Sequence, residues 1–124
     1  MSSVLLVDDD DALRVTLREI LEIDGYEVVE AYDAVKGIKL YRERPLDIII
    51  TDIMMKGESG ITVIEKLRRD YPDVKIIAIS GAFSMEKPGF LRMAKILGAN
   101  RILFKPFGRQ EMLTAVEELL SDKI

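Results

Sequence analysis

The stretch Val4-Leu-Leu-Val-Asp-Asp-Asp-Asp11 decides the fold of this chain, because four apolar residues are followed directly by four aspartates. An apolar run without polar alternation is typical of a strand covered on both faces, as strands are in parallel sheets. Three more runs have this character: Ile48 to Thr51, Ile76 to Ile79 and Ile102 to Phe104. A fifth run, Glu27 to Ala31, is weaker, and we expect it at an edge of the sheet. The sequence therefore predicts five strands.

Between and after these runs, apolar residues recur at intervals of three and four, the spacing of one helix face. The predicted helices carry the apolar sets Leu13, Leu17, Ile20 and Leu21; Ala34, Ile38 and Tyr41; Ile61, Ile64 and Leu67; Phe90, Ala94 and Leu97; and Met112, Val116, Leu119 and Leu120. We expect the first four helices to end near Gly25, Pro45, Pro72 and Gly98. Alternating strands and helices in a chain too short for an eightfold barrel predict an α/β fold. We expect an open, doubly wound parallel sheet with the flavodoxin-like strand order 2-1-3-4-5.

Composition narrows the class of protein. The 124 residues are 48% hydrophobic and 32% charged, which fits one folded domain over residues 1–124. The net charge of -4 makes direct nucleic-acid binding unexpected. The chain has no cysteine and no histidine, which excludes disulfides, Cys/His zinc sites and a histidine general base. The apolar runs are far shorter than the roughly 20 residues that span a membrane, and no signal-peptide pattern opens the chain, so we expect a cytoplasmic protein.

Polar residues follow four of the expected strands. Asp8 and Asp9 follow the run at residues 4–7, and Asp52 follows Ile48 to Thr51. Ser80 follows Ile76 to Ile79, and Lys105 follows Ile102 to Phe104. In open α/β sheets, ligands bind beyond the carboxyl ends of the strands, where the strand order reverses. We therefore expect these five side chains to converge on one site.

The aspartates divide into two groups. Asp10 and Asp11 are interpreted as helix-capping residues, whereas capping explains little for Asp8 and Asp9 at the end of a buried strand. With Asp52 beside them, each pair of carboxylates at ~4 Å would repel by on the order of 4 kcal/mol at an effective dielectric near 20. One carboxylate must take up a proton, or a cation must bind. Oxygen ligands too few for a full cage favour Mg²⁺.

The same set of groups predicts a phosphoryl-transfer site. A carboxylate can act as nucleophile, and a metal, a lysine and a hydroxyl can neutralise or bind the phosphoryl oxygens. The simpler alternatives are that Lys105 is an ordinary surface lysine and that Ser80-Gly81 is only a turn. The chain has no Walker-type glycine-rich loop, so we do not expect bound ATP to be the phosphate donor.

Four short motifs carry a family resemblance: Val4 to Asp9, Ile48 to Asp52, Ile79-Ser-Gly81 and Phe104-Lys-Pro-Phe107. In this order, at these strand ends, the sequence resembles the receiver domain of two-component response regulators, the CheY-like family, over essentially its whole length. The resemblance implies that Asp52 accepts a phosphoryl group from the phosphohistidine of a histidine kinase or a histidine phosphotransfer protein.

The resemblance also implies the metal ligands. Asp9 and Asp52 would bind Mg²⁺ directly together with the backbone carbonyl of Met54, and Asp8 would help through water.

Other residues receive roles from the resemblance as well. Ser80 and Lys105 would contact the phosphoryl oxygens, and the only chemistry expected is phosphorylation and dephosphorylation of the protein itself, so the chain would not be an enzyme in the ordinary sense. We expect the downstream protein to bind a face formed by the helix near 90–97, the strand at 102–104 and the last helix.

The chain departs from the family pattern at three positions. Lys56 stands where proline is usual, although Gly60 matches, and Ser80 stands where threonine is also frequent, which is conservative. Ile102 replaces a common aromatic residue, so the usual aromatic switch is not expected. No sequence remains after the last helix for an output domain, which favours a single-domain regulator. The alternatives are a phosphatase of the haloacid dehalogenase type with Asp8 as nucleophile, a flavodoxin-like cofactor binder, and a phosphorelay carrier or scaffold without a conformational switch.

Overall fold

The computed structural model describes residues 1–53, 55, 60–81 and 98–121. Its centre is a five-stranded parallel sheet with the order β2-β1-β3-β4-β5. The strands are β1 (Ser3–Val7), β2 (Glu27–Ala31), β3 (Ile48–Asp52), β4 (Ile76–Ser80) and β5 (Arg101–Phe104). This order confirms the predicted doubly wound α/β fold, with the weaker strand β2 at one edge.

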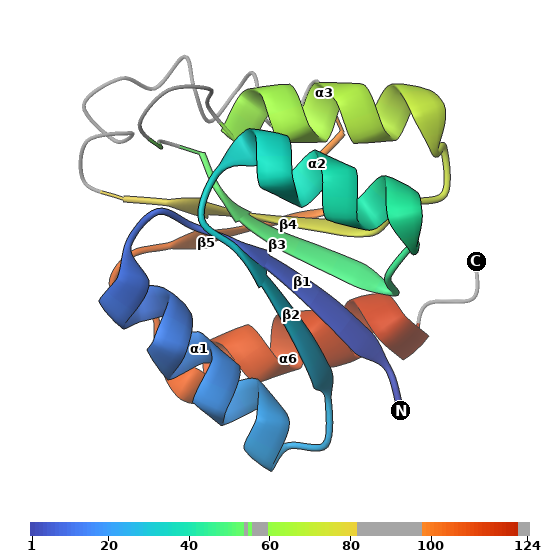
Figure 1. Cartoon of the computed structure of the whole chain (residues 1–124). Helices are drawn as coiled ribbons and strands as arrows, with labels where there is room; N and C mark the ends of the chain where they lie inside the picture. Colours follow the sequence, from blue (N-terminus) through green and yellow to red (C-terminus); the bar gives the residue numbers. More distant parts are fainter. Residues whose placement is uncertain (54, 56–59, 82–97, 122–124) are drawn as a thin grey trace.

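Four described helices cover the two faces of the sheet. They are α1 (Asp11–Ile23), α2 (Ala34–Glu43), α3 (Gly60–Asp70) and α6 (Arg109–Ser121). Helices α2 and α3 lie on one face, and α1 and α6 lie on the other (Figure 1). The predicted helix through Phe90, Ala94 and Leu97 lies outside the described residues. Among the described residues, no helix is long and apolar enough to cross a membrane.

The continuous apolar runs supply two separate cores. Along β1, Leu5 and Val7 pack in the cluster with α2 and α3, whereas Val4 and Leu6 pack in the cluster with α1 and α6. Successive side chains of a strand point to opposite faces, so a strand covered on both sides must be apolar at every position. This explains why the run at residues 4–7 shows no polar alternation.

The prediction for the last strand is partly wrong. The run Ile102 to Phe104 was expected to be buried on both faces, but only Leu103 is buried, and Phe104 is 46% exposed. The reason is position, because β5 lies at the outer end of the strand order. Ile102 is half-buried and packs against the cluster on the side of α2 and α3.

The ends of the first helix follow the expected capping pattern. Asp10 is the N-cap of α1 and accepts a hydrogen bond from the Leu13 amide at 3.2 Å. Asp11 lies in the first turn, where a negative charge is favoured by the helix dipole. After the C-cap, Gly25 has φ +94°, the left-handed conformation that commonly follows a helix. Capping therefore accounts for Asp10 and Asp11, as predicted.

Gly98 is fixed by both its backbone conformation and its neighbour Arg68. Its φ is +114°, and the Arg68 guanidinium donates to its carbonyl from Nη2 at 2.6 Å and from Nε at 3.2 Å. A Cβ atom on Gly98 would lie 2.7 Å from Arg68 Nε. The same guanidinium also donates to the carbonyl of Pro72 and the side-chain oxygen of Asn100.

We therefore expect Gly98→Ala to lower the free energy of unfolding by more than the roughly 1–2 kcal/mol cost of a left-handed non-glycine residue. Gly25→Ala is the matched control, because Gly25 also has positive φ but has nothing within 4 Å of its Cβ position. Urea denaturation of both variants measures the difference. Equal losses would mean that the contact with Arg68 contributes nothing.

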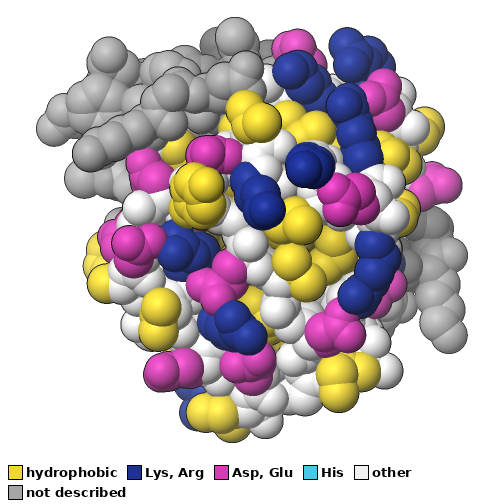
Figure 2. Space-filling view, in the orientation of Figure 1, with side chains coloured by type: hydrophobic (Ala, Val, Ile, Leu, Met, Phe, Trp, Pro, Cys, Tyr) yellow, Lys and Arg dark blue, Asp and Glu magenta, His cyan; other side chains and the backbone are white. Residues whose placement is uncertain are grey.

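Charged side chains of both signs are interspersed over the face shown in Figure 2. On the described part of this face, lysine and arginine lie beside aspartate and glutamate. Ion pairs among the described residues include Arg14–Glu30 and Arg18–Glu22. Such mixing is typical of a solvated surface and differs from the clustered basic surface of a protein that binds phosphate backbones.

Candidate functional site

The polar residues predicted from the strand ends lie together at the carboxyl ends of the strands. Asp8 follows β1, Asp52 ends β3, Ser80 ends β4 and Lys105 follows β5. Asp8, Asp52 and Ser80 are buried, with at most 5% of each residue exposed. The parallel register explains the convergence, since Asp52 pairs with Ile79 on β4, and Ser80 pairs with Phe104 on β5.

Three carboxylates lie at the centre of this site. One oxygen each from Asp8, Asp9 and Asp52 lie within 4.8 Å of one another. Asp8 Oδ1 accepts a hydrogen bond from the Asp10 amide at 2.9 Å. Asp8 Oδ2 is buried and has no hydrogen-bond partner among the described residues. The predicted cluster of three carboxylates is therefore present.

Burial, and to a smaller extent the negative charge of Asp52, raise the pKa of Asp8 from 3.8 to about 6, against the lowering effect of the Asp10 amide. From the sequence alone, repulsion between the carboxylates is the expected cost of this cluster. Desolvation is the larger cause, because Asp8 lies at the end of a strand whose every residue is buried.

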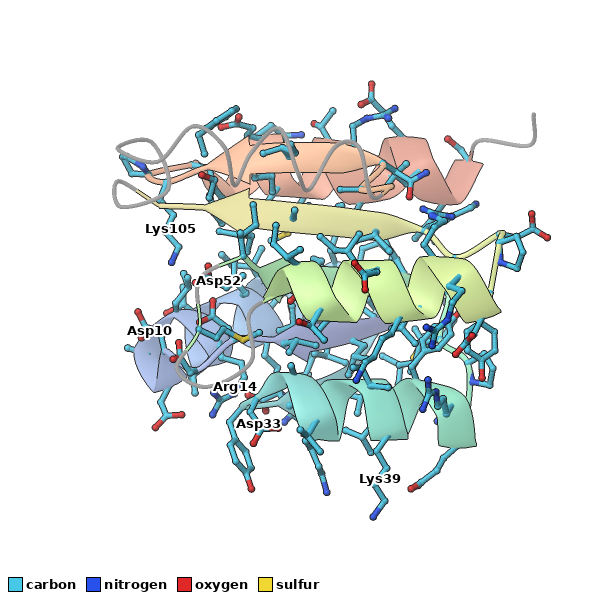
Figure 3. All side chains as sticks on the ribbon, turned by 90° about the horizontal axis from the view of Figure 1, so that it is seen from above. Asp10, Arg14, Asp33, Lys39, Asp52 and Lys105 are labelled. Atoms are coloured by element: carbon cyan, nitrogen blue, oxygen red, sulfur yellow. The ribbon has the colours of Figure 1, made fainter. Side chains whose placement is uncertain are left out.

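Lys105 pairs with Asp52. Its Nζ donates to Asp52 Oδ2 at 3.0 Å, and the lysine side chain is 30% exposed while that of Asp52 is only 7% exposed. Figure 3 shows Lys105 pointing from the end of the sheet toward Asp52. Burial lowers the pKa of Lys105, but the hydrogen bond to Asp52 and its charge outweigh burial and raise it. The contact with Asp52 is the geometry expected of a counter-ion, and a role of Lys105 at a phosphoryl group stays a prediction.

The main chain ties Lys105 to the end of β4. The Lys105 amide donates to the Ser80 carbonyl at 2.8 Å, and the Lys105–Pro106 peptide bond is cis. The Ser80 hydroxyl is buried and has no hydrogen-bond partner among the described residues. A buried hydroxyl is normally hydrogen-bonded, so the Ser80 side chain can donate to or accept from a group bound at this site.

Comparison with known proteins agrees with this geometry. The family model of the response regulator receiver domain matches residues 4–117. The chain belongs to this family. Among curated relatives, the receiver is 30% identical to the transcriptional regulatory protein CpxR of Escherichia coli K12, over 97% of this chain and 50% of CpxR. It is 33% identical to the sensor kinase CckA of Brucella abortus, over 96% of this chain and 12% of CckA.

Solved structures show the same fold. A CheY-like receiver domain protein from Methanospirillum hungatei is 29% identical, with a TM-score of 0.88 over 97% of this chain and 94% of that one. CheY4 of Vibrio cholerae is also 29% identical, with a TM-score of 0.86 over 97% and 99% of the two chains. The receiver spans about half the length of the curated regulator CpxR.

The carboxylates of this receiver domain fit a magnesium ion. Receiver domains bind Mg²⁺ at an acidic pocket, and here Asp8, Asp9 and Asp52 offer oxygen atoms at suitable separations. The buried Asp8 Oδ2 without a partner is an observation of this structure that a cation, or a water bound to one, would satisfy. Met54, the predicted carbonyl ligand, and Lys56 lie outside the described residues.

Arg14 lies beside this site, and the sequence did not predict its position there. Its Nη1 donates to the backbone carbonyl of Asp8 at 2.7 Å. The spacing of Asp11 and Arg14, three residues apart in a helix, would have predicted an ion pair between them, which the structure contains at 2.6 Å. No spacing rule would have predicted the contact with Asp8.

Proposed function

We propose that this receiver domain, residues 1–124, accepts a phosphoryl group on Asp52 with the help of Mg²⁺ and thereby changes its binding to other proteins. The observation that carries the proposal is the contact of Lys105 with Asp52, because it selects one buried carboxylate out of an acidic cluster. A nucleophile for phosphoryl transfer needs positive charge close to the oxygen that the phosphoryl group will approach.

The chemistry is a transfer between two side chains. A carboxylate oxygen of Asp52 attacks the phosphorus of a phosphohistidine; the new P–O bond forms as the P–N bond breaks, and the leaving imidazole takes up a proton. Lys105 and the hydroxyl of Ser80 then bind phosphoryl oxygens. We propose that Asp9, Asp52 and the Met54 carbonyl hold Mg²⁺ directly and that Asp8 holds it through water. The ion would neutralise charge on the phosphoryl group.

The 124 residues contain no histidine that could supply the phosphoryl group. We propose a histidine kinase or a histidine phosphotransfer protein as the donor. A groove of about 330 Å³ beside the site supports this, since Asp10 and Lys105 belong to its lining. The rest of the lining is mainly apolar and comes from α1, the loop after β5 and the start of α6, including Leu13, Leu17, Ile20, Phe107 and Met112. Such a surface can bind a partner helix while the acidic site remains within reach.

We propose that the downstream protein binds the face that includes β5 and α6. Phe104 on β5 is 46% exposed, so its aromatic ring can contact a protein bound to this face. The third element of the predicted face, the helix near 90–97, lies outside the described residues. We further propose that the domain works in the cytoplasm, without membrane or direct nucleic-acid contact, and acts on no substrate besides its own aspartate.

Incubation with a small acyl phosphate and Mg²⁺, followed by intact-mass measurement, tests this function. We expect the wild-type protein to gain one phosphoryl group and Asp52→Asn to gain none, because an amide oxygen lacks the charge of the nucleophile. Asp73→Asn, which changes an exposed carboxylate outside the cluster, is the control and should be labelled like wild type. Chelation of Mg²⁺ should prevent labelling. Equal labelling of wild type and Asp52→Asn would contradict the proposal.

A further inference from the structure

The main chain of Asp8 is held from two sides. Its amide donates to the Ala31 carbonyl at the end of β2 at 3.1 Å, and its carbonyl accepts from Arg14 Nη1 at 2.7 Å. The carbonyl of Asp8 and the amide of Asp9 belong to one rigid peptide plane. The contact with Arg14 therefore fixes the rotation of the plane that joins two of the three clustered aspartates.

Arg14 is itself held in place. Its Nε donates to Glu30 Oε1 at 2.9 Å, and its Nη2 donates to Asp11 Oδ1 at 2.6 Å, so all three guanidinium nitrogens are engaged. The Arg14 side chain is only 14% exposed. The second oxygen of Glu30 accepts from Arg18 Nη1 at 2.5 Å. Figure 3 shows Arg14 at the same end of the sheet as Asp10 and Asp52.

The positive charge of Arg14 does not by itself favour Mg²⁺ binding. A positive charge beside an acidic cluster would weaken the binding of a cation, since like charges repel. Glu30 and Asp11 compensate this charge within hydrogen-bond distance. The contribution that remains is geometric, because a guanidinium with three fixed partners can hold a carbonyl in one orientation.

We infer that Arg14, held by Glu30, is a positioning residue for Mg²⁺ binding, because it fixes the peptide between Asp8 and Asp9. This inference rests on the proposed function, in which these aspartates hold the ion. Replacement of residues that hydrogen-bond to the ligands of a metal commonly lowers the affinity of the site for that metal by about 10- to 100-fold. If Arg14 acts by geometry, its replacement should weaken Mg²⁺ binding. If it acted through its positive charge, its replacement should strengthen Mg²⁺ binding, so the two roles can be told apart.

Isothermal titration calorimetry with Mg²⁺ should show binding at least about tenfold weaker in Arg14→Met than in wild type. Arg18→Met is the matched control, because it removes the same charge from the same helix and the same partner, Glu30, but not the hydrogen bond to Asp8. We expect its affinity to equal or slightly exceed that of wild type. In the metal-free protein, the carbonyl ¹³C shift of Asp8 should change in Arg14→Met and stay unchanged in Arg18→Met.

A second pair of variants separates the hydrogen bond from the charge of Glu30. Glu30→Gln keeps an oxygen that can accept from Arg14 Nε, so its affinity for Mg²⁺ should stay within about twofold of wild type. Glu30→Leu removes the same charge together with the acceptor and should bind Mg²⁺ several-fold more weakly. This pair also supplies the test if Arg14→Met does not fold.

The outcomes distinguish this inference from the proposed function. If wild type binds Mg²⁺ and Arg14→Met binds it equally well or more tightly, the positioning role is wrong and the proposed function stands. Equal affinity of Glu30→Gln and Glu30→Leu would also overturn the positioning role. If wild type does not bind Mg²⁺, the proposed function fails, and this inference fails with it.

Discussion

Replacement of Asp8 by asparagine should stabilise the metal-free protein at neutral pH by up to about 3 kcal/mol and weaken Mg²⁺ binding. The fold raises the pKa of this carboxyl from 3.8 to about 6 through burial, and each pH unit corresponds to about 1.4 kcal/mol. Asparagine keeps an oxygen for the Asp10 amide but carries no buried charge. A substitution that removes a functional carboxylate should therefore make the protein more stable when no cation is present.

The stability gained by Asp8→Asn should depend on pH. Because the pKa of Asp8 is higher in the folded state, the folded protein binds more protons than the unfolded chain between about pH 4 and 6. The free energy of unfolding of metal-free wild type should therefore fall as the pH rises through that range. The advantage of Asp8→Asn should be small at pH 4, grow until about pH 6 and then remain constant.

Chemical denaturation with a chelator, from pH 4 to 7.5, measures this difference. Asp73→Asn is the control, since this exposed carboxylate lies outside the cluster, and it should show no comparable gain. Added Mg²⁺ should stabilise wild type more than Asp8→Asn, because a ligand stabilises the state that binds it. A variant that is less stable than wild type at pH 7 without metal would refute the assignment of Asp8 as a buried, unsatisfied charge.

Gly60→Ala should destabilise the domain by about 3 kcal/mol or more and abolish phosphoryl uptake. A Cβ atom on Gly60 would lie 1.8 Å from the carbonyl oxygen of Asp52 and 2.8 Å from its carbonyl carbon. These are backbone atoms of a central strand and cannot move aside as a flexible side chain could. The Gly60 amide also donates to the Ile53 carbonyl at 2.9 Å, so α3 begins directly against the end of β3. Relief of the contact would displace Asp52.

Thermal unfolding and intact-mass labelling of this variant check both parts of the expectation. Gly108→Ala is the control, because nothing lies within 4 Å of the Cβ position of Gly108, and it should unfold and be labelled like wild type. If Gly60→Ala had wild-type stability and wild-type labelling, the close approach of α3 to Asp52 would be irrelevant to the site.

Much of the fold could be predicted because the sheet is covered on both faces. The run at residues 4–7 has to be apolar throughout when Leu5 and Leu6 enter different cores, and the sequence displays this directly. The composition of the run at residues 102–104 gives no sign that Phe104 is exposed. An apolar run at the outer end of a sheet has the same composition as one at its centre. The exposure follows only when the predicted strand order, which places this run at the outer end, is considered together with the composition.

The site could be predicted in its residues but not in its energetics. Asp8, Asp52 and Lys105 follow apolar runs, and parallel strands bring such positions to one edge. The dominance of burial over repulsion at Asp8 depends on how deeply the end of β1 lies in the fold, which the sequence does not encode locally. The contact of Arg14 with Glu30 joins α1 to β2 and depends on how the helix packs against the sheet.

Localisation of the phosphoryl group tests the central claim most directly. The protein is treated with a small acyl phosphate and Mg²⁺, the aspartyl phosphate is reduced with borohydride, and the modified residue is identified by peptide mass spectrometry. We predict that the modification lies on Asp52, whose carboxylate contacts Lys105 at 3.0 Å. A modification on Asp8, the nucleophile expected for a phosphatase of the haloacid dehalogenase type, would contradict the account.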